Sequence, residues 1–343
     1  MPAAGRSLNP WLIACRSREL KAGRALGVVA ERHAIVLFRD ARGAAVALED
    51  RCAHRNAPLS MGKVAGGRLE CAYHGWCYDG RGRVVQVPAL PEPEAAQSAH
   101  SVKRYPASEQ DGFVWASVED AKPAVAPPAF PYLGQPGWTS FAMKTLFRAP
   151  VEACLENFLD LPHATFLHRY WFRAPTAREV RAVVRTLEDG AEAEFFEEPR
   201  ERSLVWWLLA PRGGAMRHTD RFIAPRTSRV DYAFPGGLHY VITSSCTPID
   251  ERSTQVYTVI SFRYPVIGRL VRLLFEPLSR RIIRQDVNML DAQFANIERF
   301  GGPSFAHTRA DLLGRHIAAW RGALAAGTAP PAAGEQQDVV IRI

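Results

Sequence analysis

Short apolar runs alternate with turn residues over the first third of this 343-residue chain. Glycine, proline and aspartate stand between the runs, which cover residues 34–38, 45–48, 84–87 and 112–118. Apolar runs of this length, bounded by turn formers, are typical of strands, and no long helical period passes through them. We therefore expect a small all-β domain over residues 8–120.

The next segment, residues 121–138, contains five prolines, at positions 123, 127, 128, 131 and 136. Proline fixes its own φ and has no backbone N–H to donate, so a proline-rich stretch favours an extended connection. We expect a linker here, with the domain boundary inside it. At this length, 47% apolar residues are enough to fill two hydrophobic cores.

The second half mixes helical and strand patterns, so the predicted fold class is α+β. Helices are expected over residues 149–170 and 267–300, and strands over residues 203–209, 237–244 and 254–264. These elements would form a second domain over residues 139–324. The tail, residues 325–343, opens with an Ala, Gly and Pro-rich stretch, and we expect it to be disordered or loosely attached, without a role.

The predicted helix at 267–300 has apolar positions at Ile267, Leu270, Leu274, Leu278 and Ile282. Arginines stand beside them at positions 269, 272, 280, 281 and 284. One interpretation is a helix that faces the core and solvates its basic side. The other is a helix that lies on a membrane surface, or acts as a lid, and serves a lipophilic substrate.

Composition and charge narrow the class of protein further. The net charge of +8 is spread over the chain and no nucleic-acid-binding signature accompanies it. The first twenty residues lack the pattern of a secretory signal, and no run approaches about 18 uncharged apolar residues. We therefore expect a cytoplasmic protein without a transmembrane segment. Its six irregularly spaced cysteines favour metal binding over a disulfide scaffold.

Two short segments each combine a cysteine with a histidine. Cys52 and His54 are separated by one residue, and Cys71 and His74 follow after a turn at Gly66 and Gly67. Two thiolates and two imidazoles can hold a [2Fe–2S] cluster, and they can also hold a tetrahedral zinc ion. Zinc sites usually space paired ligands by two to four residues, so the spacing of the first pair favours the cluster.

The four residues resemble the cluster motif of Rieske domains. That resemblance implies that Cys52, His54, Cys71 and His74 hold a [2Fe–2S] cluster. Rieske proteins of respiratory complexes carry an additional disulfide between the two loops, whereas the loops here offer no such cysteine pair. Cys77, outside the second loop, is interpreted as a buried thiol.

A second group of metal-binding residue types follows in the second half. Asn157, Asp160, His163 and His168 recur along one predicted helix and its continuation. Non-heme iron that binds dioxygen takes two imidazoles and one carboxylate on one face, and the two histidines would supply the imidazoles. By themselves, two histidines five residues apart are more often unrelated.

Downstream of a Rieske motif, however, this arrangement is similar to that of Rieske ring-hydroxylating oxygenases and their vanillate demethylase, dicamba monooxygenase and pheophorbide a oxygenase relatives. The resemblance implies a helix-grip catalytic domain of antiparallel sheet and helices after the Rieske domain. It also implies a mononuclear Fe(II) on His163, His168 and Asp286. Gln285 stands where those relatives carry a glutamate, and Asp291 is the alternative carboxylate.

The resemblance also assigns roles beside the iron. Asp160 would hydrogen-bond His163 and also His74 of a neighbouring subunit, which implies a homotrimer. Asn157 would support the site, or else is an amide on the helix surface.

The reaction implied by the family is monooxygenation with O2 as co-substrate. The chain has no dinucleotide-binding fingerprint, so electrons from NAD(P)H would arrive only indirectly, through a separate reductase or ferredoxin. We expect hydroxylation or oxidative demethylation of a bulky, mostly apolar molecule, sterol-like or tetrapyrrole-like. The alternatives are a small aromatic acid and, in another class, an electron-transfer protein without oxygenase activity.

Residues that contact the substrate are harder to assign from the sequence. Candidates for the pocket walls, or else for plain core, are Trp206, Trp207, Tyr240 and Tyr257. His218 and His239 are either substrate contacts or ordinary surface or core residues.

Overall fold

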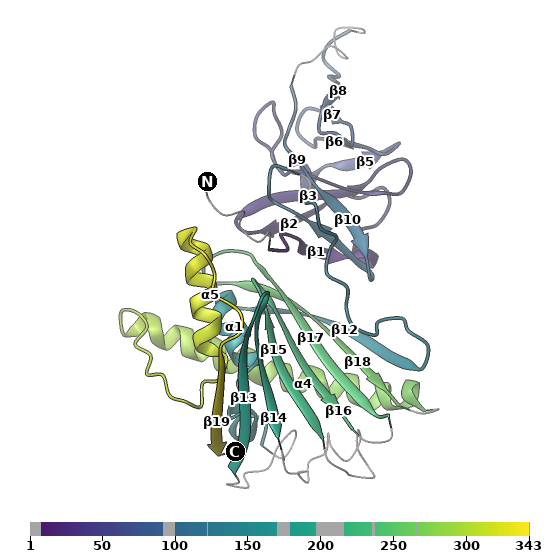
Figure 1. Cartoon of the computed structure of the whole chain (residues 1–343). Coiled ribbons are helices and arrows are strands. Elements are labelled where there is room, and N and C mark those ends of the chain that lie inside the picture. Colours follow the sequence, from purple (N-terminus) through teal and green to yellow (C-terminus); the bar gives the residue numbers. More distant parts are fainter. Residues whose placement is uncertain are drawn as a thin grey trace. The chain divides into compact units, whose positions relative to one another are not determined.

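The computed structural model describes residues 8–91, 100–121, 123–169, 179–196, 216–234, 237–264 and 267–342. The chain forms two compact units (Figure 1). One unit comprises residues 9–129 together with 247–250, and the other comprises the remaining residues from 130 onward together with 1–8. The division between residues 129 and 130 lies inside the proline-rich segment.

The N-terminal unit is built from three small antiparallel sheets, as the apolar runs predicted. The first sheet is β1 (Leu12–Arg16), β11 (Phe113–Ala116) and β10 (Ala107–Gln110). The second is β2 (Leu26–Ala30), β3 (His33–Arg39), β4 (Ala45–Glu49) and β9 (Arg104–Tyr105). The third is β5 (Lys63–Ala65), β6 (Arg68–Glu70), β7 (Cys77–Tyr78) and β8 (Val84–Gln86). Two short 3-10 turns, Ser17–Glu19 and Leu59–Met61, complete the unit.

Strand β3 is buried on both of its faces. Its residues Val36 and Phe38 enter the core that also contains the two cluster cysteines, whereas Ile35 and Leu37 enter a second core beneath β1 and β11. Successive side chains of a strand point to opposite faces, so a strand between two cores must be apolar throughout. The position of β3 between two cores therefore explains why residues 34–38 are apolar without interruption.

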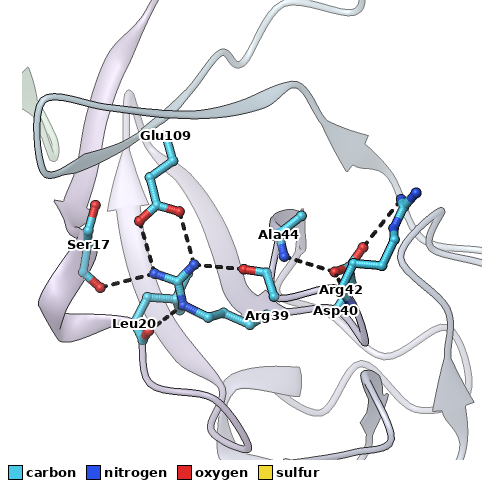
Figure 2. Close-up of polar contacts among 8 residues, drawn as sticks. Ser17, Leu20, Arg39, Asp40, Arg42, Ala44 and Glu109 are labelled. Atoms are coloured by element: carbon cyan, nitrogen blue, oxygen red, sulfur yellow. Dashed lines mark hydrogen bonds and ion pairs between the residues drawn. The ribbon is translucent and has the colours of Figure 1, made fainter.

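Arg39, at the end of β3, joins three segments of this unit (Figure 2). Its guanidinium donates to both carboxylate oxygens of Glu109, at 2.9 and 3.0 Å, and to the backbone carbonyls of Leu20, Gly43 and Ser17. Such bidentate pairs are the stronger kind of ion pair. The bond from Arg39 is the main cause that lowers the pKa of Glu109.

The C-terminal unit is an eight-stranded antiparallel sheet with helices packed on it, which confirms the α+β class (Figure 1). In spatial order its strands are β12 (Trp138–Phe147), β18 (Thr254–Arg263), β17 (His239–Pro248), β16 (Thr227–Ala233), β15 (Arg217–Ile223), β14 (Gly190–Phe196), β13 (Glu179–Leu187) and β19 (Gln336–Arg342). The helices are α1 (Val151–Phe158), α2 (His163–Phe166), α4 (Gly268–Arg299) and α5 (Gly314–Ala326). The predicted strand at 203–209 lies outside the described residues.

The prediction of a single helix over residues 149–170 is wrong, because the structure has two short helices there. Helix α1 ends at Phe158 and α2 begins at His163, with Pro162 immediately before it. Proline disfavours helical backbone in the residue that precedes it, so the chain bends between the two helices. The bend separates the Asn157 segment from the histidines.

Helix α4 confirms the predicted helix, but its core-facing stripe differs from the predicted one. Val271, Phe275 and Leu278 are buried against the sheet, whereas Leu270 and Leu274 are 59% and 62% exposed. The first turns of α4 carry two apolar stripes, and periodicity alone does not say which one meets the core. None of the described helices is long and apolar enough to span a membrane.

The expectation of a loose tail is wrong for the last residues. Residues 336–342 form β19, which pairs with β13 from Glu179↔Arg342 to Arg185↔Gln336. Val339 and Ile341 are buried, whereas Val340 between them is exposed. Without β19, strand β13 would expose an unpaired edge, so the tail completes the sheet.

Candidate metal centres and the cavity beside them

Two loops of the N-terminal unit bring the four cluster residues together. Cys52 and His54 follow β4, and Cys71 and His74 lie between β6 and β7. Both cysteines are buried, while the His54 and His74 rings lie nearer the surface with their centroids 4.5 Å apart. The thiols therefore face inward and the imidazoles outward.

Local backbone bonds shape these loops. Cys52 N–H donates to Ala57 O, and Cys71 N–H donates to Trp76 O, each at 2.9 Å. Gly75 has a φ of +71°, a left-handed conformation that favours glycine and that turns the chain after His74. The sequence Cys-Ala-Tyr-His-Gly therefore closes its own loop.

The polar atoms of this site fit a [2Fe–2S] cluster. His54 Nδ1 is buried and has no hydrogen-bond partner among the residues that the structure describes, and Trp76 stacks on the same ring with the centroids 4.7 Å apart. A buried ring nitrogen without a partner is costly unless it binds something. The Tyr78 hydroxyl accepts a bond from the Ala53 N–H at 3.0 Å and lies 3.1 Å from Cys52 Sγ, so its proton is directed to the sulfur. None of the six cysteines forms a disulfide in this structure.

The second candidate site lies in the C-terminal unit. His163 belongs to α2, His168 follows that helix, and Asp286 is in the middle of α4. Their ligand atoms all lie within 4.8 Å of one another, with Asp286 Oδ1 3.0 Å from His168 Nε2 and 3.6 Å from His163 Nε2. Two metal bonds of about 2.1 Å separate their ligands by about 3.0 Å at a right angle and about 3.4 Å at a tetrahedral angle.

Hydrogen bonds on the far side of each imidazole set which nitrogen faces the carboxylate. His163 Nδ1 donates to the backbone carbonyl of Asp160, and His168 Nδ1 donates to Gln285 Oε1 at 2.9 Å. In the neutral rings the unprotonated Nε2 atoms then face Asp286. Among the described residues, the buried Asp286 Oδ1 has no hydrogen-bond donor. Three acceptor atoms that converge in this way fit a bound cation, and this donor set suits non-heme iron.

The electrostatics of the site agree with that fit. Burial opposes charge on both partners, yet Asp286 raises the pKa of His163, and the two histidines lower the pKa of Asp286. The site therefore stabilises an ionised carboxylate next to a positive charge, which a proton or a metal ion can supply. Asp291, the alternative carboxylate, does not join this group.

Asp160 and Asn157 stand beside the histidines. The Asp160 carboxylate lies 3.6 Å from His163 Nδ1, while the hydrogen bond to that ring comes from the backbone carbonyl of the same residue. Burial raises the pKa of Asp160, against the lowering influence of His163. Asn157 Oδ1 is buried and has no hydrogen-bond partner in the described part of the chain. Both residues line a cavity that also contains the two histidines and Asp286.

This cavity lies between the helices and the inner face of the sheet and has about 860 Å³ of empty space, including its opening to solvent. Apolar and aromatic residues form most of its wall, among them Met143, Phe158, Val230, Tyr240, Ile242, Ile260 and Phe275. Among the described lining residues there is no arginine or lysine. The ionisable residues of the described lining are His163, His168, Asp160, Asp220 and Asp286.

Comparison with known proteins identifies the two domains that contain these sites. The profile of the Rieske [2Fe-2S] domain matches residues 10–106, and that of the vanillate O-demethylase oxygenase C-terminal domain matches residues 147–327. A 4beta-methylsterol monooxygenase of Methylococcus capsulatus is 32% identical over 279 residues, which cover 75% of this chain and 69% of that protein. The chain belongs to the Rieske-type oxygenases.

Two further comparisons concern a plant relative and a solved structure of this Rieske oxygenase's family. The chloroplastic protein TIC 55 of Arabidopsis thaliana is 27% identical over 78% of this chain, which spans only 50% of that relative. Among solved structures, dicamba monooxygenase bound to dicamba superimposes with a TM-score of 0.78 at 22% identity. That superposition covers 94% of this chain and 98% of the other. It confirms the fold, and family membership makes the protein an oxidoreductase.

The remaining residues predicted to contact the substrate, where the structure describes them, lie in different parts of the C-terminal unit. Tyr240 lines the cavity, whereas Tyr257 is buried elsewhere in the sheet. His218 and His239 lie on opposite faces of the sheet, each paired with an aspartate. Trp206 and Trp207 lie outside the described residues.

Sequence reasoning missed one wall of the cavity, which β15 and β16 supply through Asp220, Ser228, Val230 and Tyr232. Buried and less buried positions alternate along both strands, as expected for strands with one face turned inward. Several of the inward positions carry polar residues, so the sequence does not show the apolar alternation by which a strand is recognised.

Proposed function

We propose that this Rieske oxygenase is a monooxygenase that hydroxylates or oxidatively demethylates a neutral, bulky and mainly apolar molecule, sterol-like or tetrapyrrole-like. The observation that carries this proposal is the lining of the cavity beside His163, His168 and Asp286. The lining is mostly apolar and, among the described residues, holds aspartates but no cationic side chain. A carboxylate substrate would meet negative charge there without a partner.

The small aromatic acid is therefore the weaker candidate. An electron-transfer protein is weaker still, since it would leave the cavity and the C-terminal metal site unused. The methylsterol monooxygenase among the relatives supports a large neutral substrate.

When bound, the [2Fe–2S] cluster on Cys52, His54, Cys71 and His74 would supply single-electron transfer, and Fe(II) on His163, His168 and Asp286 would supply dioxygen activation. The side chains around these ligands fix their geometry. Gln285 and the Asp160 carbonyl orient the two imidazoles, and the apolar wall keeps water away from the substrate.

Electrons would come from a separate reductase or ferredoxin, and ultimately from NAD(P)H. Between the two sites we propose the route of the family, in which Asp160 meets His74 of a neighbouring subunit within a homotrimer. Two observations support it: His74 is exposed, and the Asp160 side chain is 34% exposed. The cytoplasmic location stays a prediction.

The test is oxygen uptake by the holoenzyme with a surrogate reductase, measured together with product. Neutral polycyclic alcohols and ethers are compared with benzoates of similar reactivity. We expect coupled turnover with the neutral compounds. Coupled turnover of benzoates alone would refute the proposed substrate class.

Metal analysis tests the second site separately. The wild type should hold one iron beyond the two of its cluster, and His163→Ala should lose that iron and all turnover while the cluster spectrum stays intact. His307→Ala, at an exposed histidine, is the matched control. A His163→Ala enzyme that still oxygenates substrate would show the site assignment to be wrong.

A further inference from the structure

Asp220 lies on the sheet wall of the cavity, whereas the three candidate iron ligands lie on its helical wall. Along β15 the side chains of His218, Asp220 and Phe222 are buried on the inner face and alternate with less buried residues. Asp220 is 3% exposed and lines the same cavity as His163 and Asp286. It is also near enough to raise the pKa of Asp160 through charge repulsion, as a minor cause. A buried carboxylate thus belongs to the substrate space without belonging to the metal site.

His218 holds Asp220 in place. Its Nε2 lies 3.0 Å from Asp220 Oδ1, and the ring is fully buried between Phe195 and Tyr232, with centroids 4.4 and 4.2 Å away. Stacking on both faces keeps the imidazole from rotating, so the carboxylate it contacts is also fixed. Within the described part of the chain, no donor contacts the other oxygen of Asp220.

Three of the hydroxyl groups that line the cavity are already engaged with each other or with the backbone. Ser244 and Thr258 share a hydrogen bond at 2.9 Å, and Ser279 donates to the Phe275 carbonyl of its own helix at 2.8 Å. Asp220 is therefore the strongest hydrogen-bond acceptor on the sheet wall. A carboxylate in an apolar cavity is costly unless a donor meets it, and it repels anions.

We propose that Asp220 binds a hydrogen-bond donor of the substrate, a hydroxyl or N–H group, and so selects neutral molecules with an apolar body and one such donor. The inference rests on the proposed function and narrows it. His218 acts through Asp220 as a positioning residue. An ether or ketone in place of the donor would leave the Asp220 oxygen unmet, and an acid would be repelled.

The test measures binding to the iron-loaded holoenzyme without reductant, so that nothing turns over. The probes are cholestanol, its 3-methyl ether and its 3-sulfate, and 2-naphthol with its methyl ether. Isothermal titration gives each dissociation constant. We expect the wild type to bind each alcohol roughly 10- to 100-fold more tightly than its methyl ether, which is the range of a hydrogen bond to a charged group. The sulfate should bind most weakly.

Three variants separate recognition from structure. Asp220→Leu should lose the preference for alcohol while it binds the ether as the wild type does. Asp220→Asn keeps the shape of the side chain and should lose most of the preference, which covers the case in which the leucine variant does not fold. The matched control is Asp231→Asn. Its carboxylate pairs with His239 at 2.6 Å on the outer side of the sheet, where the side chain is 27% exposed, and it should leave every ratio unchanged.

The outcomes distinguish the two proposals. If the probes bind but the ratio of the alcohol and ether dissociation constants is the same in the wild type and in the Asp220 variants, Asp220 has only a structural role. That result would refute this inference and leave the proposed function standing. An equal loss of alcohol and ether in both Asp220 variants has the same meaning. If the wild type binds neither the neutral steroids nor the neutral naphthalenes, the proposed class of neutral substrates is refuted, and this inference is refuted with it.

Discussion

Replacing Gln285 by leucine should weaken iron binding at the C-terminal site. The Gln285 amide oxygen accepts the Nδ1 proton of His168 at 2.9 Å, and His168 is only 4% exposed, so water has little access to replace it. Leucine has a similar volume but accepts no hydrogen bond. The imidazole would lose the contact that fixes its tautomer and its orientation toward Asp286.

Two physical estimates of the loss agree. Outer contacts of metal ligands are typically worth about 10- to 100-fold in metal affinity, and that factor corresponds to about 1.4–2.8 kcal/mol. Leaving a buried N–H without a partner costs about 1–3 kcal/mol. We therefore expect the Fe(II) dissociation constant of Gln285→Leu to rise by roughly 10- to 100-fold.

The assay is anaerobic competition for Fe(II) with a coloured chelator, and the visible absorbance of the cluster serves as the internal measure of an intact N-terminal unit. Gln285→Glu restores an acceptor and should bind iron at least as tightly as the wild type. Gln293→Leu, at an exposed glutamine on the same helix, should change nothing. An affinity of Gln285→Leu within twofold of the wild type, or an equal loss in Gln293→Leu, would refute the reasoning.

Three further predictions concern the rest of the chain. Glu109→Gln should lower the stability of the N-terminal unit near pH 7 by about 1–2 kcal/mol, because it removes a charged, partly exposed pair with Arg39. The lowered pKa of Glu109 means that this contribution is present above the ordinary glutamate pKa and is lost as the pH falls through the folded value. Denaturant midpoints followed at the cluster absorbance should therefore converge for both proteins in acid, and divergence there would contradict the assignment. Tyr78→Phe removes the hydroxyl next to Cys52 Sγ, which stabilises the more negative, reduced cluster more than the oxidised one. A redox titration should show a potential lowered by about 40 mV for each kcal/mol of that difference, and an unchanged potential would contradict the assignment. Val339→Asp places a charge in the buried face of the C-terminal strand and should lower the melting temperature of the C-terminal unit, whereas an unchanged melting curve would mean that this strand is dispensable.

The residues that the sequence alone could identify are those whose partners lie close along the chain. Cys52 with His54, and Cys71 with His74, each occupy one loop that its own backbone bonds close. His163 and His168 are likewise five residues apart. In the two cysteine and histidine loops the local geometry already fixes which atoms can meet, so residue type and spacing by themselves indicated a metal site there. The two later histidines indicated an iron site only through the resemblance to Rieske oxygenases.

Tertiary structure decided everything that depends on distant segments. Residue spacing by itself does not choose between Asp286 and Asp291, although the family resemblance favours Asp286, and the fold brings Asp286 to the two histidines. The same holds for the face of α4 that is buried, for the pairing of the C-terminal strand with β13, and for Asp220 in the cavity wall. Strand pairing and helix packing join residues across large separations in the chain, and they are set by which apolar surfaces the whole fold must cover.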